Sequence, residues 1–253
     1  IHRVTEDIDI HIKPPAEMGI NENPKNNKAR NIAARKQFYD WLADSIKING
    51  IISTERDHEF DDIPSYRSGG IRLHYKNFTE QVAGLKDGIL LETGFDTVTP
   101  NNVLSISSWA LNKAIKQEVA VIDNRAIGIA CYHPGYTFVE KLQTIATKFR
   151  QEQETGEERQ NLMRQYYDVY SLLGHKQVQD FVGTEEYQTH KAIRFPKIDY
   201  TIPLGENEAF LLTNSDLRNR FIERYQLTAK LYYNGQPDFK EILAVIDQWV
   251  GKL

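Results

Sequence analysis

The stretch Glu6-Asp7-Ile8-Asp9-Ile10 decides the interpretation of this chain, because it alternates charged and apolar residues. The alternation continues to Ile12, which is typical of a half-buried strand. Successive side chains of a strand point to opposite faces, so Asp7 and Asp9 share one face. We expect His11 to join them there, and the three isoleucines of residues 8–12 to point into the core.

Two carboxylates side by side repel each other unless a cation lies between them. Mg²⁺ accepts oxygen ligands, is usually held by one or two carboxylates plus substrate phosphates, and activates phosphoryl chemistry. Asp7 and Asp9 are therefore candidate magnesium ligands. A polar strand face turned to solvent has the same pattern, and a bare D-x-D motif has a high rate of chance matches.

Composition excludes several classes of protein. The chain has 253 residues, 40% of them apolar, which is enough for one or two domains. We expect neither a membrane-spanning segment nor a signal peptide, because the chain has no long apolar run and no apolar region near residue 1. The single cysteine, Cys131, excludes an internal disulfide and a cysteine-based zinc cluster, and it fits a reducing cytoplasm. The net charge of −4 means that a nucleic-acid partner would need a local basic patch.

The pattern along the chain predicts an α+β part, residues 1–132, followed by an all-helical part, residues 133–253. Strands are expected at residues 8–12, 71–75, 88–95 and within 119–132, and a helix at residues 28–48. Further helices are expected around residues 138–149 and over 159–173, 214–233 and 238–250, with a polar connector at 151–158. Gly174 should end the second of these helices, and Asn214 or Ser215 should cap the third.

Three more residues are candidates for the site. Glu92 is the one charge in the apolar strand 88–95, where it is costly unless it is paired, binds a metal or lies on a solvated edge. Lys141 lies beside the apolar stripe of its helix and could contact a triphosphate, although surface lysines are common. Asp168 lies among tyrosines, so we expect its carboxylate to be partly desolvated and to have Lys141, on the preceding helix, as its strong partner. The alternative is a weak ion pair with Arg164 at i,i+4.

Three segments carry a family resemblance. The stretch Arg3-Val4-Thr5-Glu6-Asp7-Ile8-Asp9-Ile10 resembles the "R-x-S-x-D-I-D-L" strand of the AbiEii/AbiGii toxin family of nucleotidyltransferases. Residues 133–142, His-Pro-Gly-Tyr-Thr-Phe-Val-Glu-Lys-Leu, resemble a helix of that family with the signature "E-K-L". Residues 164–170, Arg-Gln-Tyr-Tyr-Asp-Val-Tyr, resemble its "R-D-x-Y-D-L" helix. The three segments occur in the family's order, so together they are more specific than any one alone.

The resemblance implies a nucleotidyltransferase with a mixed sheet like that of the DNA polymerase β superfamily, followed by an all-helical domain that completes the active site. It makes Asp7 and Asp9 the metal-binding acids, Lys141 the lysine that contacts the nucleotide, and Asp168 a later essential acid. Glu92 is similar in place to the superfamily's third strand carboxylate, a metal and nucleotide ligand.

The chain departs from the family pattern in two places. The family's Gly-Gly-Ser/Thr element, which cradles the phosphates, would precede residue 1, so we expect that a segment is missing there. Gln165 replaces the first acid of the "R-D-x-Y-D" helix, which suggests that Asp168 alone is needed.

The leading hypothesis is a toxin of a toxin–antitoxin or phage-abortive system. It would use two Mg²⁺ ions to transfer a nucleoside monophosphate from an NTP to an RNA end, such as a tRNA, or to a protein hydroxyl. A cognate antitoxin is an expected partner. The basic residues at positions 25, 28, 30, 35 and 36 are where an RNA backbone would bind, although such runs usually only solvate a helix. A metal-dependent nuclease and a non-catalytic module that binds an antitoxin are the alternatives.

Overall fold

The computed structural model describes residues 2–3, 7–78, 87–159 and 161–253. The chain forms two compact units. The sheet unit is Thr5–Val98, and the helical unit is Thr99–Leu253 together with Ile1–Val4. Residues 4–6 of the first motif and residue 160 of the predicted helix 159–173 lie outside the described residues.

The sheet unit contains a four-stranded mixed sheet with the strand order β1-β4-β3-β2. Strand β1 runs parallel to β4, and the other two neighbouring pairs are antiparallel. The strands are β1 Asp7–Ile10, β2 Ile51–Asp57, β3 Ser68–Tyr75 and β4 Ile89–Gly94. The predicted α+β class with a mixed sheet is confirmed, whereas β2 was not predicted.

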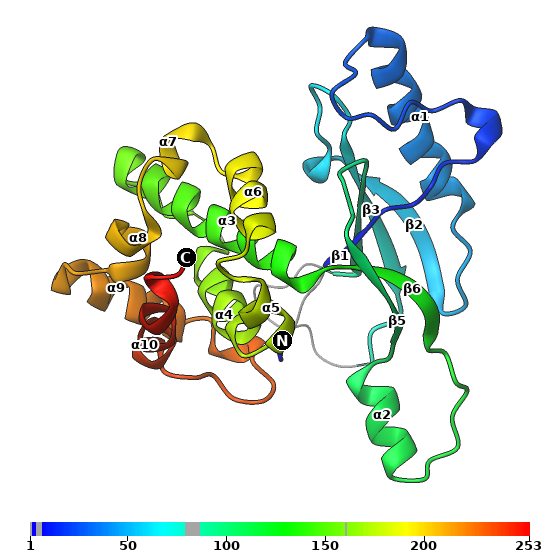
Figure 1. Ribbon diagram of the computed structural model, residues 1–253. Coiled ribbons are helices and arrows are strands. Elements are labelled where there is room, and N and C mark those ends of the chain that lie inside the picture. The colour runs from blue at the N-terminus through cyan, green and yellow to red at the C-terminus, as the bar shows by residue number, and fades with distance from the viewer. Residues whose placement is uncertain (1, 4–6, 79–86, 160) are drawn as a thin grey trace. The chain divides into compact units, whose positions relative to one another are not determined.

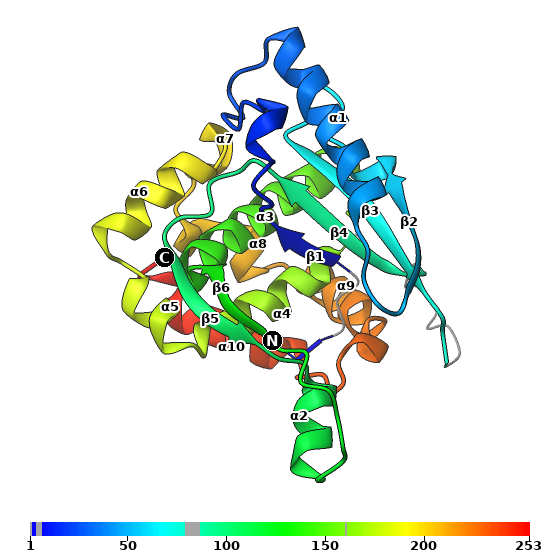
Figure 2. The same ribbon diagram turned by 90° about the vertical axis from the view of Figure 1, so that its right-hand side faces the viewer.

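Helix α1, Ala29–Ser45, covers one face of this sheet (Figures 1 and 2). Its apolar side buries Phe38 and Leu42 against Ile71 and Leu91. Two predicted isoleucines, Ile10 and Ile12, pack partly buried against this core. Ile8 was predicted to do the same and is instead about half exposed, because it lies on the edge strand β1.

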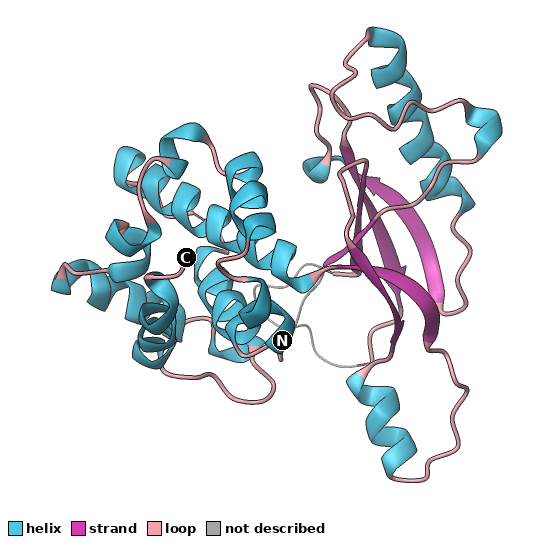
Figure 3. Ribbon diagram, viewed as in Figure 1, coloured by secondary structure: helices cyan, strands magenta, loops and turns pink. Residues whose placement is uncertain are grey.

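In the helical unit, a two-stranded antiparallel hairpin precedes the main group of helices (Figures 1 and 3). It consists of β5 Asn101–Ile106 and β6 Ala126–Tyr132, with α2 Trp109–Lys116 between them. The strand predicted within residues 119–132 is β6, whereas β5 and α2 were not predicted. The two compact units divide at Thr99, before the hairpin, and the main helices begin at Pro134.

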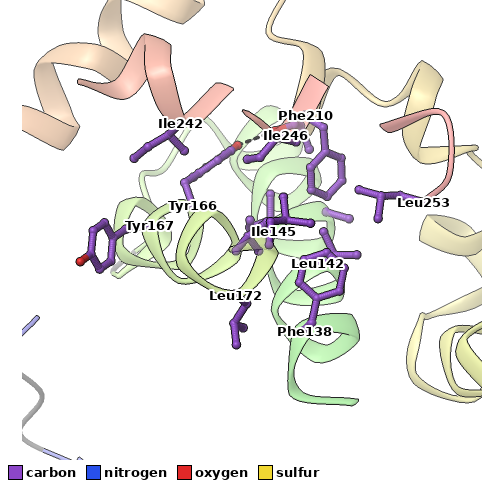
Figure 4. Close-up of a cluster of buried hydrophobic side chains, with 14 of the residues drawn as sticks. Phe138, Leu142, Ile145, Tyr166, Tyr167, Leu172, Phe210, Ile242, Ile246 and Leu253 are labelled. Carbon is purple, nitrogen blue, oxygen red and sulfur yellow. Dashed lines mark hydrogen bonds between the residues drawn. The ribbon is translucent and has the colours of Figure 1, made fainter. Parts of the chain in front are cut away.

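The long helix α3, Pro134–Thr155, packs against α4, Leu162–Leu173, and both contribute to the core of the helical unit (Figure 4). The remaining helices are α5 Lys176–Phe181, α6 Glu185–Arg194, α7 Lys197–Tyr200, α8 Glu208–Leu211, α9 Ser215–Gln226 and α10 Phe239–Val250. Short 3-10 turns occur at Ala16–Met18, His58–Phe60, Leu204–Glu206 and Ala229–Leu231. Helices α5 to α8 were not predicted.

The polar connector predicted at residues 151–158 is wrong over its first part, because α3 continues to Thr155. Glu152 is buried, and its carboxylate accepts two hydrogen bonds from Arg224 at 2.8 and 2.9 Å. This pairing lets an acidic residue lie on the packed side of a helix. Gly156 then ends α3 in the left-handed conformation at φ 72°, which glycine adopts at low cost.

Two helix ends agree with the residues that were expected to form them. Gly174 directly follows α4, as predicted. Asn214 caps α9, since its side chain accepts a hydrogen bond from the backbone N–H of Leu217 at 2.9 Å. The predicted helix 214–233 is too long, because α9 stops at Gln226. Within the described residues, every helix is too short or too polar to cross a membrane.

Candidate active site

The sheet unit places the predicted carboxylates on one face. In the parallel pairing of β1 with β4, Asp9 lies beside Glu92 and Asp7 lies beside Leu90. Neighbouring residues of paired strands point to the same side, so the three acids share a face. The alternate residues, among them Leu91, contribute to the core beneath α1. The acids therefore occupy the face of the sheet opposite α1.

The acids on this face influence one another's charge. Partial burial, together with the negative charges of Asp9 and Asp7, raises the pKa of Glu92 to about 7. The positive charge of Arg72 acts in the opposite direction. A carboxyl that neighbouring acids hold partly protonated at neutral pH gains from any cation that enters.

Arg72 is a buried neighbour of Glu92 that the sequence interpretation missed. It lies on β3, on the same face as Glu92, and is bound by Asp57 from β2. Its Nε and Nη2 donate to Oδ2 of Asp57 at 3.1 and 2.5 Å. This guanidinium is thus already paired, so it only partly offsets the negative charge of Asp7, Asp9 and Glu92.

The donor set of this face fits a divalent cation. Asp7, Asp9 and Glu92 offer only carboxylate oxygens, which Mg²⁺ prefers. Asp9 and Asp7 raise the pKa of Glu92 because like charges repel. Over the described ranges, no three His, Cys, Asp or Glu side chains lie close enough together to enclose a metal by themselves. Mg²⁺ commonly takes only one or two carboxylates and completes its coordination with water and substrate phosphates.

The helical unit places Asp168 and Lys141 in contact. Asp168 on α4 is only 1% exposed, and its Oδ2 lies 3.5 Å from Nζ of Lys141 on α3. Its main partner is Arg3, whose Nε and Nη2 donate to the two carboxylate oxygens at 2.7 and 2.8 Å. The expected burial of Asp168 and its contact with Lys141 are confirmed, but Lys141 is not its strongest partner. The shorter, two-pronged contact with Arg3 dominates, because both carboxylate oxygens are satisfied by one planar group.

The alternative for Asp168, an ion pair with Arg164, is not what satisfies its carboxylate. Arg164 instead donates through Nη2 to the side-chain oxygen of Asn161. Arg3 could have been suspected from the sequence, since it opens the first family-like motif. No local pattern connects it with Asp168, because the two residues are 165 positions apart.

Lys141 belongs to a group of cations. Burial lowers the pKa of Lys148, which is also on α3, and the positive charges of Lys141 and Arg164 lower it further. Cations that lower each other's pKa stabilise a bound anion when one is present. Lys141 is 29% exposed, so it remains accessible to a ligand.

Several other predicted residues have structural roles. His11 does not extend the carboxylate face: its Nε2 lies 3.2 Å from Glu22, and its ring meets Phe95 edge-on. Arg35, from the basic run, is fully buried and donates to backbone carbonyls, including that of Ser65 at 3.0 Å. It is therefore unavailable to RNA.

Two further residues, Cys131 and His133, lie near the end of β6. His133 precedes α3, and its Nδ1 accepts the backbone N–H of Gly135 at 3.1 Å. Cys131 is partly buried in β6. Among the described residues, neither belongs to a group of three His, Cys, Asp or Glu side chains that could hold a metal ion.

Comparison with known proteins gives one match. A family model described as nucleotidyl transferase AbiEii toxin, type IV TA system, matches residues 1–245 of the 253. Neither the curated proteins nor the solved structures contain a significant match.

Proposed function

Because the chain belongs to the AbiEii family of nucleotidyl transferase toxins of type IV toxin–antitoxin systems, we propose that it transfers a nucleoside monophosphate from an NTP to an acceptor hydroxyl in a Mg²⁺-dependent reaction. The acceptor oxygen forms a bond to the α-phosphorus, the bond from that phosphorus to the bridging oxygen breaks, and pyrophosphate leaves. The proton of the acceptor hydroxyl passes to solvent water. The acidic face of the sheet is the observation that carries the proposal.

Asp7, Asp9 and Glu92 would hold the metal in this reaction. Bound Mg²⁺ supplies charge neutralisation on the triphosphate and activates the acceptor oxygen. The raised pKa of Glu92 supports this role, because a group of acids that repel one another favours a cation. The sheet holds the carboxylates on rigid strands, so the protein contributes positioning and electrostatics.

Lys141 would bind the triphosphate, with Lys148 and Arg164 adding positive charge. Asp168 would position Lys141 through the contact at 3.5 Å, while Arg3 fixes that carboxylate through two hydrogen bonds. Asp168 is enclosed by these partners, which supports a positioning role more than direct contact with the reacting atoms. Side chains of the helical unit would therefore bind the nucleotide.

An RNA end, such as that of a tRNA, is the acceptor that we propose, and a protein hydroxyl is the alternative to be tested. Lys25, Lys28, Arg30 and Lys36 remain as candidate contacts for RNA phosphates, since Arg35 is removed from the run. A cognate antitoxin is the proposed regulatory partner. We place the reaction in the cytoplasm, which supplies both NTP and RNA.

The deciding experiment incubates the protein with Mg²⁺, total RNA and each α-labelled NTP in turn, and follows label in RNA and in protein. We expect label to enter RNA, pyrophosphate to be released, and EDTA to stop both. Shortening of the RNA without label would instead indicate a nuclease. Absence of Mg·NTP binding, measured by titration calorimetry, would indicate a non-catalytic module that acts by binding an antitoxin.

A further inference from the structure

The helical unit has a concave feature that is lined by none of the residues assigned to nucleotidyl transfer. It is a pocket of about 360 Å³ at the start of α3 and beside α5 and α6. We call it the aromatic pocket. The lining residues that matter here are His133, Tyr136, Gln177, Asp180, Phe181 and Glu186. Its volume lies at the small end of the range for ligand sites.

Three rings form the apolar part of the aromatic pocket. Tyr136 stacks on Phe181 with ring centres 4.9 Å apart, and His133 lies 5.6 Å from Phe181. The packing behind the rings is tight, since a Cβ atom on Gly135 would lie 2.4 Å from the ring of Phe181. The glycine therefore allows α3 to approach α5 closely, and the rings form a preformed surface.

The charge of the aromatic pocket is negative. Asp180 and Glu186 line it, and no lysine or arginine is among its lining residues in the described chain. Lys176 pairs with Asp180 at 2.8 Å, but both side chains are exposed, and such pairs at i,i+4 contribute little. Burial lowers the pKa of His133, and the nearby His175 lowers it further, so His133 adds no positive charge at neutral pH.

We propose that the aromatic pocket binds the guanidinium group of an arginine side chain on a protein partner. A guanidinium is planar, stacks on aromatic faces and donates pairs of hydrogen bonds to carboxylates. The rings and the two acids match both properties. A nucleic acid fits less well, because Asp180 and Glu186 would repel its phosphates. The pocket would thus be a protein-recognition site, separate from the residues that we assign to transfer.

The test titrates isotopically labelled full-length protein with a blocked Gly-Arg-Gly peptide and follows amide shifts by NMR. Matched peptides contain citrulline, which has the shape of arginine without the charge, or lysine, which has the charge without the planar fork. We expect the arginine peptide to shift signals of residues 133–136 and 177–186. Citrulline should bind about tenfold more weakly, consistent with the loss of a cation–π and ionic contact.

Two double variants complete the test. Asp180→Asn with Glu186→Gln removes the acids of the aromatic pocket and should weaken the arginine peptide about tenfold. Asp216→Asn with Glu223→Gln removes two exposed acids on α9 and should leave the peptide affinity unchanged. Both variants should keep the wild-type melting temperature and transfer activity. Equal binding of arginine and citrulline, or tighter binding of a short single-stranded RNA after the pocket acids are removed, would overturn the proposal.

Discussion

The acidic side chains of the two units differ in burial and in their partners. In the sheet unit, partial burial and the negative charges of Asp9 and Asp7 raise the pKa of Glu92, while Arg72, which is paired with Asp57, acts in the opposite direction. In the helical unit, the more deeply buried Asp168 is held by Arg3 through two hydrogen bonds. The carboxylate of Asp168 is satisfied within its own unit, whereas the acids of the sheet are the residues that we propose as metal ligands.

The largest expected effect comes from the sheet acids. Asp9→Asn should lower transfer by about a thousandfold, roughly 4 kcal/mol in the barrier, because a metal-holding carboxylate is lost. In metal-free buffer the melting temperature should stay the same or rise, since a repulsion with Glu92 is relieved. Steady-state transfer and thermal melting measure the two quantities. Asp44→Asn, an exposed acid of the same unit, is the control, and full activity in Asp9→Asn would end the metal assignment.

The opposite behaviour is expected for the helical unit. Arg3→Met leaves the buried carboxylate of Asp168 without its main partner and should lower the free energy of unfolding by about 3 kcal/mol. Asp168→Asn with Arg3→Met should recover part of that loss, because neither charge remains. Chemical denaturation of the single and double variants measures the coupling between the pair. Independent, additive losses would show that the contact has no energetic role.

Substitution of Lys141 should weaken ligand binding and leave the stability of the fold almost unchanged. Lys141→Ala is expected to weaken Mg·NTP binding by about 1–3 kcal/mol, the range for a hydrogen bond to a charged group. Its effect on the free energy of unfolding should stay within about 0.5 kcal/mol, because the side chain is partly exposed. Titration calorimetry measures the first quantity and denaturation the second. The exposed Lys240, changed to Ala, provides the comparison, and equal NTP affinities for the two variants would remove Lys141 from the site.

The smallest effect is a pH dependence of the sheet unit. The pKa of Glu92 is raised to about 7, so its protonated form favours the folded state. Without metal, the contribution of Glu92 to the free energy of unfolding should be fully present below about pH 4.5, the ordinary pKa of Glu. This contribution should be lost as the pH rises through 7. Discounted for solvent screening, the loss should be about 1 kcal/mol.

Glu92→Gln should remove that part of the pH dependence, as measured by melting at pH 5 and pH 8. Addition of Mg²⁺ at pH 8 should stabilise the wild type more than this variant. An unchanged difference in melting between the two pH values would mean that the acids on this face do not interact in the folded protein.

The sequence predicted the parts of the site that depend on local pattern. Alternation placed Asp7 and Asp9 on one strand face, and the apolar neighbours of Glu92 predicted a strand around it. Helix boundaries at Gly174 and Asn214 followed from residues that cap helices through their own backbone or side chain. Ile8 and His11 were predicted less well. Alternation predicts which face of the sheet a side chain is on, but it does not predict which residues pack against that face.

Segments with weak periodicity escaped prediction for a related reason. Strands β2 and β5 mix polar and apolar residues, and they are defined by the strands that pair with them. The extension of α3 through Glu152 was missed because a polar stretch resembles a loop until its buried partner, Arg224, is known. In each case, a distant partner decides the structure.

The amino-acid sequence by itself determined the class of fold, the carboxylate pair of β1 and the family to which the chain was likened. Only the tertiary structure decided that Asp9 lies beside Glu92, that Arg3 binds Asp168, and that Arg35 is buried. Periodicity and capping act over a few residues, so they are visible in the order of amino acids. Register between strands and pairing of charges depend on how distant segments pack together, and that packing is a property of the whole folded unit.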